Sequence, residues 1–288
     1  MVHVSHRPAG RPDATSPAPR SDVVPLASRR DSPTQRALRV LACFSPTRRE
    51  LSLTQIAVAT GLPMSTAHRI VGELVGGGAL VRSGKSGYHV GIRLCEIAAS
   101  SPHGTGLREI SWPYLEDVYE ATRENVLLAV RDGVDMVYVA RLSGRDSVPV
   151  LRDVGRRRSL TTTGTGLVLL AHAPTEVQEQ VLHGPLRRYT SKTVTDPDEL
   201  RVVLAEVRRT GYAATEGTLA PRAMGCGVPV RGANDEVVAS LGVVAHSGAA
   251  QPRMLVPVLM GPARGLSREL GAPSARRSLP GTRRSCPV

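Results

Sequence analysis

Aromatic side chains are scarce in this chain, and it has no long apolar run. Phe, Trp and Tyr make up 3% of the 288 residues, whereas the hydrophobic share as a whole is 41%. We therefore expect real hydrophobic cores, built mainly from Val, Leu and Ala. No apolar run approaches the roughly 18 residues that a membrane-spanning helix needs. The Pro- and Arg-rich N-terminus also lacks the apolar segment of a signal peptide, so we expect no membrane association.

Cysteine is also rare, and its positions exclude two common roles. Cys43, Cys95, Cys226 and Cys286 stand far apart and form no C-x-x-C pair. Neither a zinc site nor a disulfide framework is indicated by that spacing. Reduced thiols in a cytoplasmic protein are the simplest interpretation, and we expect no metal and no cofactor.

Basic residues are in excess, and the excess is confined to particular blocks. The net charge is +12, of which residues 31–95 carry +5, residues 1–30 carry +3 and residues 271–288 carry +4. The large block of residues 96–270 is neutral. A general surplus of Arg from a GC-rich coding sequence would have made that block basic too. The distribution favours a polyanion-binding head on a neutral body.

Residues 53–74 have the pattern of two short helices joined by a tight turn. Gly61 supplies the left-handed position that ends the first helix, and Pro63 suits the start of the second. The apolar residues of the second helix follow the spacing of a buried stripe; they are Ala67, Ile70, Val71 and Leu74. Its other face carries hydroxyls, a His and an Arg. This arrangement is typical of a helix-turn-helix with a recognition helix.

A short hairpin is predicted directly after the recognition helix. Residues 79–82 and 88–90 read as strands around a Gly/Lys/Ser loop. A hairpin in that place is the wing of a winged helix-turn-helix. We expect Arg82 and Lys85 to reach phosphates or the minor groove from it.

The chain divides into five segments. We predict a disordered basic tail (1–30), the winged helix-turn-helix domain (31–92), a linker helix (93–112), a second domain (113–270) and another basic tail (271–288). The second domain alternates strands joined as hairpins with helices gathered between them, which indicates an α+β domain around an antiparallel sheet. Its predicted strands are 126–130, 136–140, 148–151, 226–230 and 237–244, and its predicted helices are 164–172, 175–182, 197–210 and 254–270.

Motifs in both domains resemble one family, the IclR-type bacterial transcriptional regulators. The motifs occur in family order: RALRVL at 36–41, LTQIA at 53–57, TGLP at 60–63, STAHR at 65–69, YHVG at 88–91, DGVDMVY at 132–138, GRR at 155–157, LTTT at 160–163 and GYA at 211–213. The resemblance implies a winged-helix head and a GAF-like effector domain. It also implies a homodimer or homotetramer that binds double-stranded DNA at a palindromic operator and responds to a small organic acid.

The exposed side of the recognition helix supplies the predicted base-reading residues. We expect Ser65, Thr66, His68 and Arg69 there, with Arg69 the best candidate for a bidentate contact to guanine. A separate set, Arg36, Thr54 and Gln55, is expected to grip the DNA backbone. The alternative is that Ser65 and Thr66 only cap the helix and that His68 is a solvated surface residue.

The start of the helix predicted from residue 164 is the candidate effector site. Backbone amides at a helix start bind carboxylates, although a close-packed strand-to-helix turn would show the same glycines. The resemblance extends the predicted pocket to Val150, Gly164, Thr165, Glu216, Cys226, Gly242 and Val244. Leu167 replaces the family's Lys, and Gly242 and Val244 replace its alternating serines. We therefore hypothesise a larger, more apolar acid than a short keto acid, or no ligand.

Two other classes of protein compete with a ligand-responsive regulator. A constitutive DNA-binding or architectural protein would use the second domain only to dimerise. An enzyme would use Cys226 as a nucleophile with His246 or His172 as base, but no local signature supports it, and a lone Cys on a strand is usually a core residue.

Overall fold

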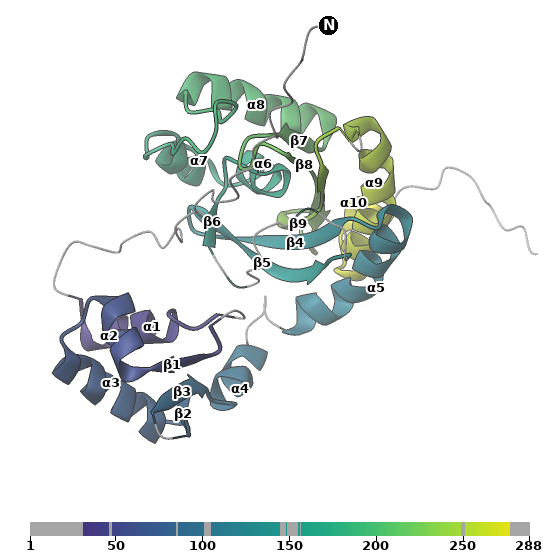
Figure 1. Cartoon of the computed structure of the whole chain (residues 1–288). Coiled ribbons are helices and arrows are strands. Elements are labelled where there is room, and N and C mark those ends of the chain that lie inside the picture. Colours follow the sequence, from purple (N-terminus) through teal and green to yellow (C-terminus); the bar gives the residue numbers. More distant parts are fainter. Residues whose placement is uncertain are drawn as a thin grey trace, which may run out of the picture.

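A computed structural model describes residues 31–45, 48–84, 86–100, 105–144, 148, 155, 157–248 and 251–276 (Figure 1). Several predictions lie outside these residues: the 1–30 tail, most of the 271–288 tail, Lys85, Val150 and nearly all of the 148–151 strand. Among the helices in the described ranges, none is long and apolar enough to cross a membrane.

The N-terminal domain is a small helical unit backed by a three-stranded antiparallel sheet. Its elements are α1 (Pro33–Leu41), β1 (Glu50–Ser52), α2 (Leu53–Thr60), α3 (Met64–Gly76), β2 (Leu80–Ser83) and β3 (Gly87–Val90). The strand order is β1-β3-β2, so the wing hairpin of β2 and β3 is completed by the strand that precedes α2. This is the predicted winged helix-turn-helix.

Local sequence signals begin and end the helices of this domain. Ser32 and Gln35 form a reciprocal capping box at the start of α1, and Ser52 and Gln55 form a second one at the start of α2. These pairs satisfy amide groups that a helix start otherwise leaves without partners. Gly61 ends α2 with a φ of 66°, which confirms the predicted left-handed turn.

The second domain is built on a six-stranded antiparallel sheet. Its strands are β4 (Asn125–Asp132), β5 (Asp135–Leu142), β6 (Arg157–Ser159), β7 (Ala213–Glu216), β8 (Ala223–Arg231) and β9 (Val237–His246), in the order β6-β5-β4-β9-β8-β7. Its helices are α5 (Thr105–Thr122), α6 (Gly164–Ala171), α7 (Thr175–Leu182), α8 (Pro197–Thr210), α9 (Pro252–Glu269) and the short α10 (Pro273–Arg276). The predicted α+β class with an antiparallel sheet is confirmed.

Each face of this sheet is covered by a different pair of helices. α5 and α9 cover one face; on the other, α6 lies against the strands and α8 packs on α6 (Figure 1). Neighbouring residues of β4 alternate between the two cores, with Leu128 facing α5 and α9 and Leu127 facing α6 and α8. Both faces of the sheet are therefore shielded from solvent, which is why the sequence of β4 is a continuous apolar run.

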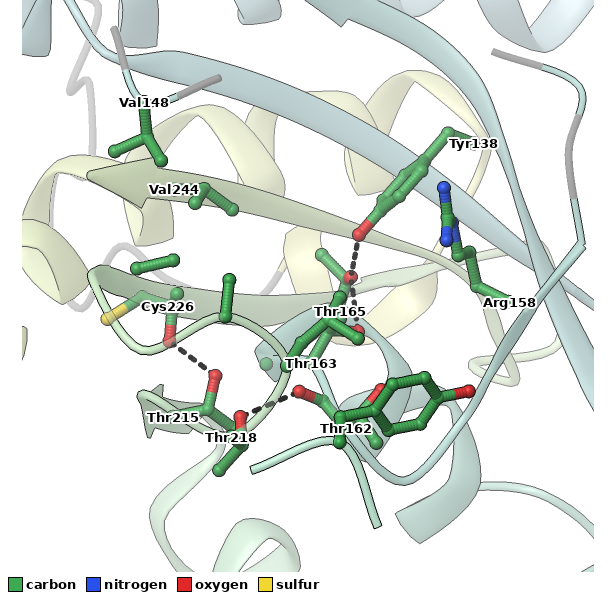
Figure 2. A pocket seen from close by; sticks show the side chains of 16 residues that line it. Tyr138, Val148, Arg158, Thr162, Thr163, Thr165, Thr215, Thr218, Cys226 and Val244 are labelled. Atoms are coloured by element: carbon green, nitrogen blue, oxygen red, sulfur yellow. Dashed lines mark hydrogen bonds between the residues drawn. The ribbon is translucent and has the colours of Figure 1, made fainter. Parts of the chain in front are cut away.

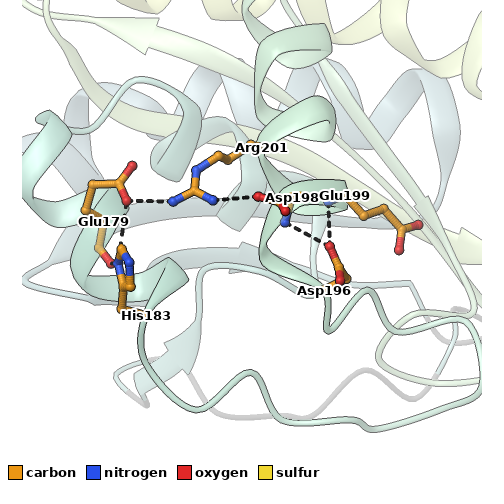
Figure 3. A network of polar contacts seen from close by, with 6 residues as sticks. All are labelled: Glu179, His183, Asp196, Asp198, Glu199 and Arg201. Carbon is orange, nitrogen blue, oxygen red and sulfur yellow. Dashed lines mark hydrogen bonds and ion pairs between the residues drawn. The ribbon is translucent and has the colours of Figure 1, made fainter.

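Helices α7 and α8 are tied together at the surface by one arginine. Arg201 of α8 donates to Glu179 of α7 at 2.7 Å and to Asp198 in its own first turn at 2.8 Å (Figure 3). Asp196 caps α8 by accepting the amides of Asp198 and Glu199, and Gly211 ends it with a φ of 77°. The predicted bounds of this helix are thus confirmed, as are the predicted cap at Asp196 and the predicted stop at Gly211.

Three predictions about the organisation need correction. The boundary at residues 112 and 113 falls inside α5, and Leu107 is buried in the effector-domain core. Residues 93–112 are therefore not one helix, because α4 (Arg93–Ala99) is separate from α5. Ala272 is buried and α10 follows it, so the described start of the C-terminal tail is ordered structure.

Candidate DNA-binding surface and effector pocket

Helix α3 presents the predicted base-reading residues on its outer side. Ser65, His68 and Arg69 are exposed, and Thr66 is half-buried. The opposite stripe is inside the domain, where Ala67, Ile70 and Val71 are buried. The spacing that predicted the buried face therefore also selects which polar residues remain available to DNA.

The hydroxyls at the start of α3 are not used as helix caps. Pro63 occupies the N-cap position, and no side-chain hydrogen bond caps this helix. The alternative that Ser65 and Thr66 serve only as caps is therefore wrong. A helix start without a side-chain cap presents amides that suit a DNA phosphate.

Arg69 has a partner on its own helix. Its Nη1 lies 2.6 Å from Oε1 of Glu73, one turn further on, and both side chains are more than half exposed. Exposed pairs of this kind contribute about 0–1 kcal/mol. The guanidinium is thus aligned along the outer face of α3 but held only weakly.

The residues expected to grip the DNA backbone have different local roles. Gln55 accepts the Ser52 amide at 2.8 Å through Oε1, so it is a capping residue as well as an exposed polar group. Thr54 beside it is exposed, and Arg36 on α1 is half-buried. On the wing, Arg82 lies over the ring of Tyr88 at 5.7 Å from the centroid.

A cavity of about 270 Å³ lies in the second domain, between the start of α6 and strands β5, β8 and β9 (Figure 2). Its wall combines Thr and Tyr hydroxyls with small and aliphatic side chains. The described residues that line it are Tyr138, Val148, Arg158, Thr162, Thr163, Gly164, Thr165, Tyr189, Thr215, Thr218, Leu219, Ala220, Ala223, Gly225, Cys226 and Val244.

A short chain of hydroxyls crosses the cavity wall. The Tyr138 hydroxyl lies 3.5 Å from Thr165 Oγ1, which lies 3.3 Å from Thr163 Oγ1. Burial raises the pKa of Tyr138, while the hydrogen bonds from Thr165 and Thr163 oppose that shift. Tyr138 is therefore a neutral hydroxyl that can donate or accept at the wall.

Two loops meet over the cavity and are joined by threonine hydroxyls. Thr190 donates to the Gly217 carbonyl at 2.6 Å, and Thr193 donates to the Thr218 carbonyl at 2.7 Å. Thr218 in turn donates to the Thr162 carbonyl at 2.8 Å. Because Tyr189 and residues 218–220 line the cavity, these bonds hold part of its cover in place.

Four of the predicted pocket residues line the cavity. They are Gly164, Thr165, Cys226 and Val244. The close-packed alternative for the glycines also holds. A Cβ on Gly164 would lie 2.9 Å from the Cys226 backbone, so α6 could not approach β8 with a larger residue there.

Two other predicted pocket residues are not part of the cavity wall. Glu216 is exposed and accepts a hydrogen bond from Ser247. Gly242 is buried behind the wall, where a Cβ would collide with Thr165 Cγ2 and lie 2.6 Å from the Cys226 carbonyl oxygen. Gly242 therefore leaves room for Thr165 and does not face a ligand.

Most of the hydroxyls and the one arginine in the described wall were not predicted from the sequence. Arg158 lies on β6, a strand that was not predicted, and Tyr189 and Thr218 come from loops. Tyr138 lies in a motif that was recognised, but residues 136–140 form a continuous apolar run, so their pattern does not show which face Tyr138 joins. The loop residues carried no comparable signal.

The chemistry of Cys226 does not support a nucleophile. Its side chain is buried, and burial raises the pKa of the thiol to about 11. His172 is occupied, since its Nδ1 lies 2.9 Å from the Val168 carbonyl oxygen. A thiolate is the reactive form of cysteine, so this cysteine acts as a small apolar wall residue.

Together, the head with its exposed recognition helix and the second domain with its ligand-sized cavity define a DNA-binding transcriptional regulator with an effector domain. Two family descriptions match the chain: "IclR helix-turn-helix domain" over residues 33–84 and "Bacterial transcriptional regulator IclR C-terminal" over residues 99–267. The chain belongs to the IclR family of bacterial transcriptional regulators and is not an enzyme.

Named relatives and solved structures agree with this assignment. The Pca regulon regulatory protein of Pseudomonas putida is 27% identical, over 82% of each chain. The glycerol operon regulatory protein of Streptomyces coelicolor is 26% identical, over 83% of this chain and 96% of its own. An IclR homolog from Microbacterium hydrocarbonoxydans, solved in complex with 4-hydroxybenzoate, is 36% identical with a TM-score of 0.77, over 83% of this chain and 99% of that one.

Proposed function

We propose that this regulator binds a palindromic operator as a homodimer or homotetramer, and that a small carboxylic acid in the cavity changes its affinity for that operator. The observation that carries the proposal is the presence in one chain of an exposed recognition helix and a hydroxyl-lined cavity of about 270 Å³. Such a protein acts where the DNA is, in the cytoplasm.

On the DNA side, the roles follow from exposure. Ser65, His68 and Arg69 would enter the major groove, with Arg69 reading guanine. Arg82 on the wing, together with Arg36, Thr54 and Gln55, would hold phosphates and fix the orientation of α3. Thr66 lies in the first turn of α3, where its amide and hydroxyl suit a phosphate.

On the effector side, we propose an acid with a single ring or a branched carbon skeleton. The cavity is near the lower end of the roughly 300–1,000 Å³ range of ligand pockets, so the ligand is small. One side of the cavity is apolar, with Val148, Val244 and Cys226. The 4-hydroxybenzoate bound by the Microbacterium homolog is a compound of this size and type.

Helix α4 is the proposed contact between the DNA-binding heads of two subunits. Ile92, just before the helix, is 73% exposed, and Ile97 within it is 61% exposed. None of the residues of α4 is buried within the chain. A second copy of this face, related by a two-fold axis, would cover both side chains and match the symmetry of a palindromic operator.

The proposal is tested on operator DNA found by genome-wide footprinting of the full-length protein. Fluorescence anisotropy then measures operator affinity with and without 4-hydroxybenzoate, a branched aliphatic acid and glyoxylate. We expect the first or second compound to shift the affinity, and glyoxylate to have no effect. An affinity that no acid changes would favour the constitutive DNA-binding protein, and tight binding of glyoxylate would contradict the size argument.

A further inference from the structure

We propose that Arg158 binds the carboxylate of the effector and makes the pocket selective for acids over neutral compounds of the same shape. The inference rests on the proposed effector function and names the residue that reads the ligand's charge. Arg158 lies on β6, is half-buried and forms part of the cavity wall.

The kind of side chain that Arg158 brings to the wall is the first support. It is the arginine among the described residues that line the cavity, and the others named there are hydroxyl-bearing, apolar or small. An anion that enters this half-enclosed, largely apolar space gives up water around its charge. A guanidinium offsets this loss of hydration, because its paired N–H donors match the two oxygens of a carboxylate.

The second support is that protein groups already occupy the start of α6. Thr163 Oγ1 already accepts the Gly166 amide at 3.0 Å. The backbone of β8 is pressed against the same turn, because a Cβ on Gly227 would lie 2.6 Å from both the Thr165 nitrogen and the Gly164 carbonyl carbon. This end of α6 is therefore partly filled by the protein itself, and the arginine is the stronger anion site.

The shape of the cavity also gives the ligand a direction. Figure 2 shows Arg158 and Tyr138 on one side of the cavity and Val148, Val244 and Cys226 on the other. The position of Val148 is set by Asn125, whose Nδ2 donates to the Val148 carbonyl at 2.9 Å. A ring acid would place its carboxylate at Arg158 and its ring between the apolar side chains.

The preceding residue on the strand supplies a matched control. Arg157 is exposed and pairs with Asp132 and Asp135 across the neighbouring strands, away from the cavity wall. Successive side chains of a strand point to opposite faces. Arg157→Met and Arg158→Met therefore remove the same charge from the same strand on its two sides.

The test is isothermal titration calorimetry of the full-length protein with 4-hydroxybenzoate and with 4-hydroxybenzamide, its neutral counterpart. We expect Arg158→Met to weaken acid binding by roughly tenfold to a hundredfold, the range for a lost hydrogen bond to a charged group, and to leave amide binding almost unchanged. Arg158→Lys should keep part of the preference for the acid, and Arg157→Met should keep all of it. Thermal unfolding of each variant confirms that it is folded.

The outcomes separate this inference from the proposed function. Suppose that the wild type binds the acid. If Arg158→Met binds the acid equally well, or if its affinities for the acid and the amide fall by the same factor, the role of Arg158 is refuted and the effector function stands. If the wild type binds neither compound nor a branched aliphatic acid, both proposals are refuted.

Discussion

Arg69 and Glu73 form an ion pair along the outer face of the recognition helix, with 2.6 Å between Nη1 and Oε1. The pair holds the guanidinium in an extended position parallel to the helix. It also places a carboxylate on the face of α3 that is proposed to meet DNA. If Arg69 reads a base as proposed, DNA binding would exchange Glu73 for a base edge, and the weak energy of exposed pairs makes that exchange feasible.

Removing Arg69 should reduce sequence preference. Arg69→Ala is expected to cost roughly 1–3 kcal/mol on the operator and to relax the choice of base at one position. Glu73→Gln, the matched change, should tighten binding to operator and random DNA alike, by no more than about fivefold. Anisotropy titrations on both DNAs at one salt concentration measure the two effects. Equal losses on operator and random DNA for Arg69→Ala would refute its role in base reading.

Gly242 should tolerate no side chain, although it lies in a regular strand. A Cβ there meets Thr165 and the Cys226 carbonyl, so Gly242→Ala is expected to lower the free energy of unfolding by about 1–3 kcal/mol through overpacking. The control is Gly72→Ala in the middle of α3, which is exposed and has no contact within 4 Å of the added carbon beyond its own helix. That change should stabilise the helix by roughly 0.5–1 kcal/mol. Urea unfolding compares the two, and equal effects would contradict the packing argument.

Local signals predicted the helices well, and non-local pairing explains what was missed. The Asp196 cap and the Gly211 stop lie in the sequence next to the helix that they bound. Strands β1 and β6 have only three residues each and exist because β3 and β5 pair with them. No periodicity can be read from three residues, so the strand that carries Arg158 could not be recognised.

The candidate sites divide in the same way. The exposed face proposed to read bases follows from one helix and its 3.6-residue period, so its residues could be named from the sequence. The cavity is assembled from β5, β6, α6, β7, β8, β9 and several of the segments that connect them. Family resemblance located its glycine turn and Cys226, but it also named Glu216 and Gly242, which the structure places outside the wall.

Cys226 should resist alkylation in the folded protein. Because burial raises the pKa of its thiol from 9.0 to about 11, the thiolate is scarce at pH 8. Cys95 is exposed on α4 and should react before Cys226. Iodoacetamide labelling followed by mass spectrometry of peptides distinguishes them. Rapid labelling of Cys226 at pH 8 in folded protein would contradict the assignment as a buried wall residue.

The same shift predicts a loss of stability in alkali. The folded state binds the Cys226 proton more tightly than the unfolded state does, so its contribution is fully present below pH 9 and is lost between pH 9 and about 11. Unfolding free energies of the wild type and of Cys226→Ala should therefore converge as the pH rises through this window. Parallel curves for the two proteins would show that the thiol does not titrate there.

Thr218→Val should loosen the cover of the pocket. The change keeps the shape of the side chain but removes the hydrogen bond to the Thr162 carbonyl, which ties residues 217–222 to the turn before α6. We expect faster amide hydrogen exchange in that loop, because local opening becomes easier when a tether is lost. Thr195→Val is the control, since the Thr195 hydroxyl accepts from Arg188 at 2.6 Å within its own loop. Exchange at 217–222 that is unchanged in Thr218→Val, or raised equally in the control, would show that this hydroxyl does not hold the cover.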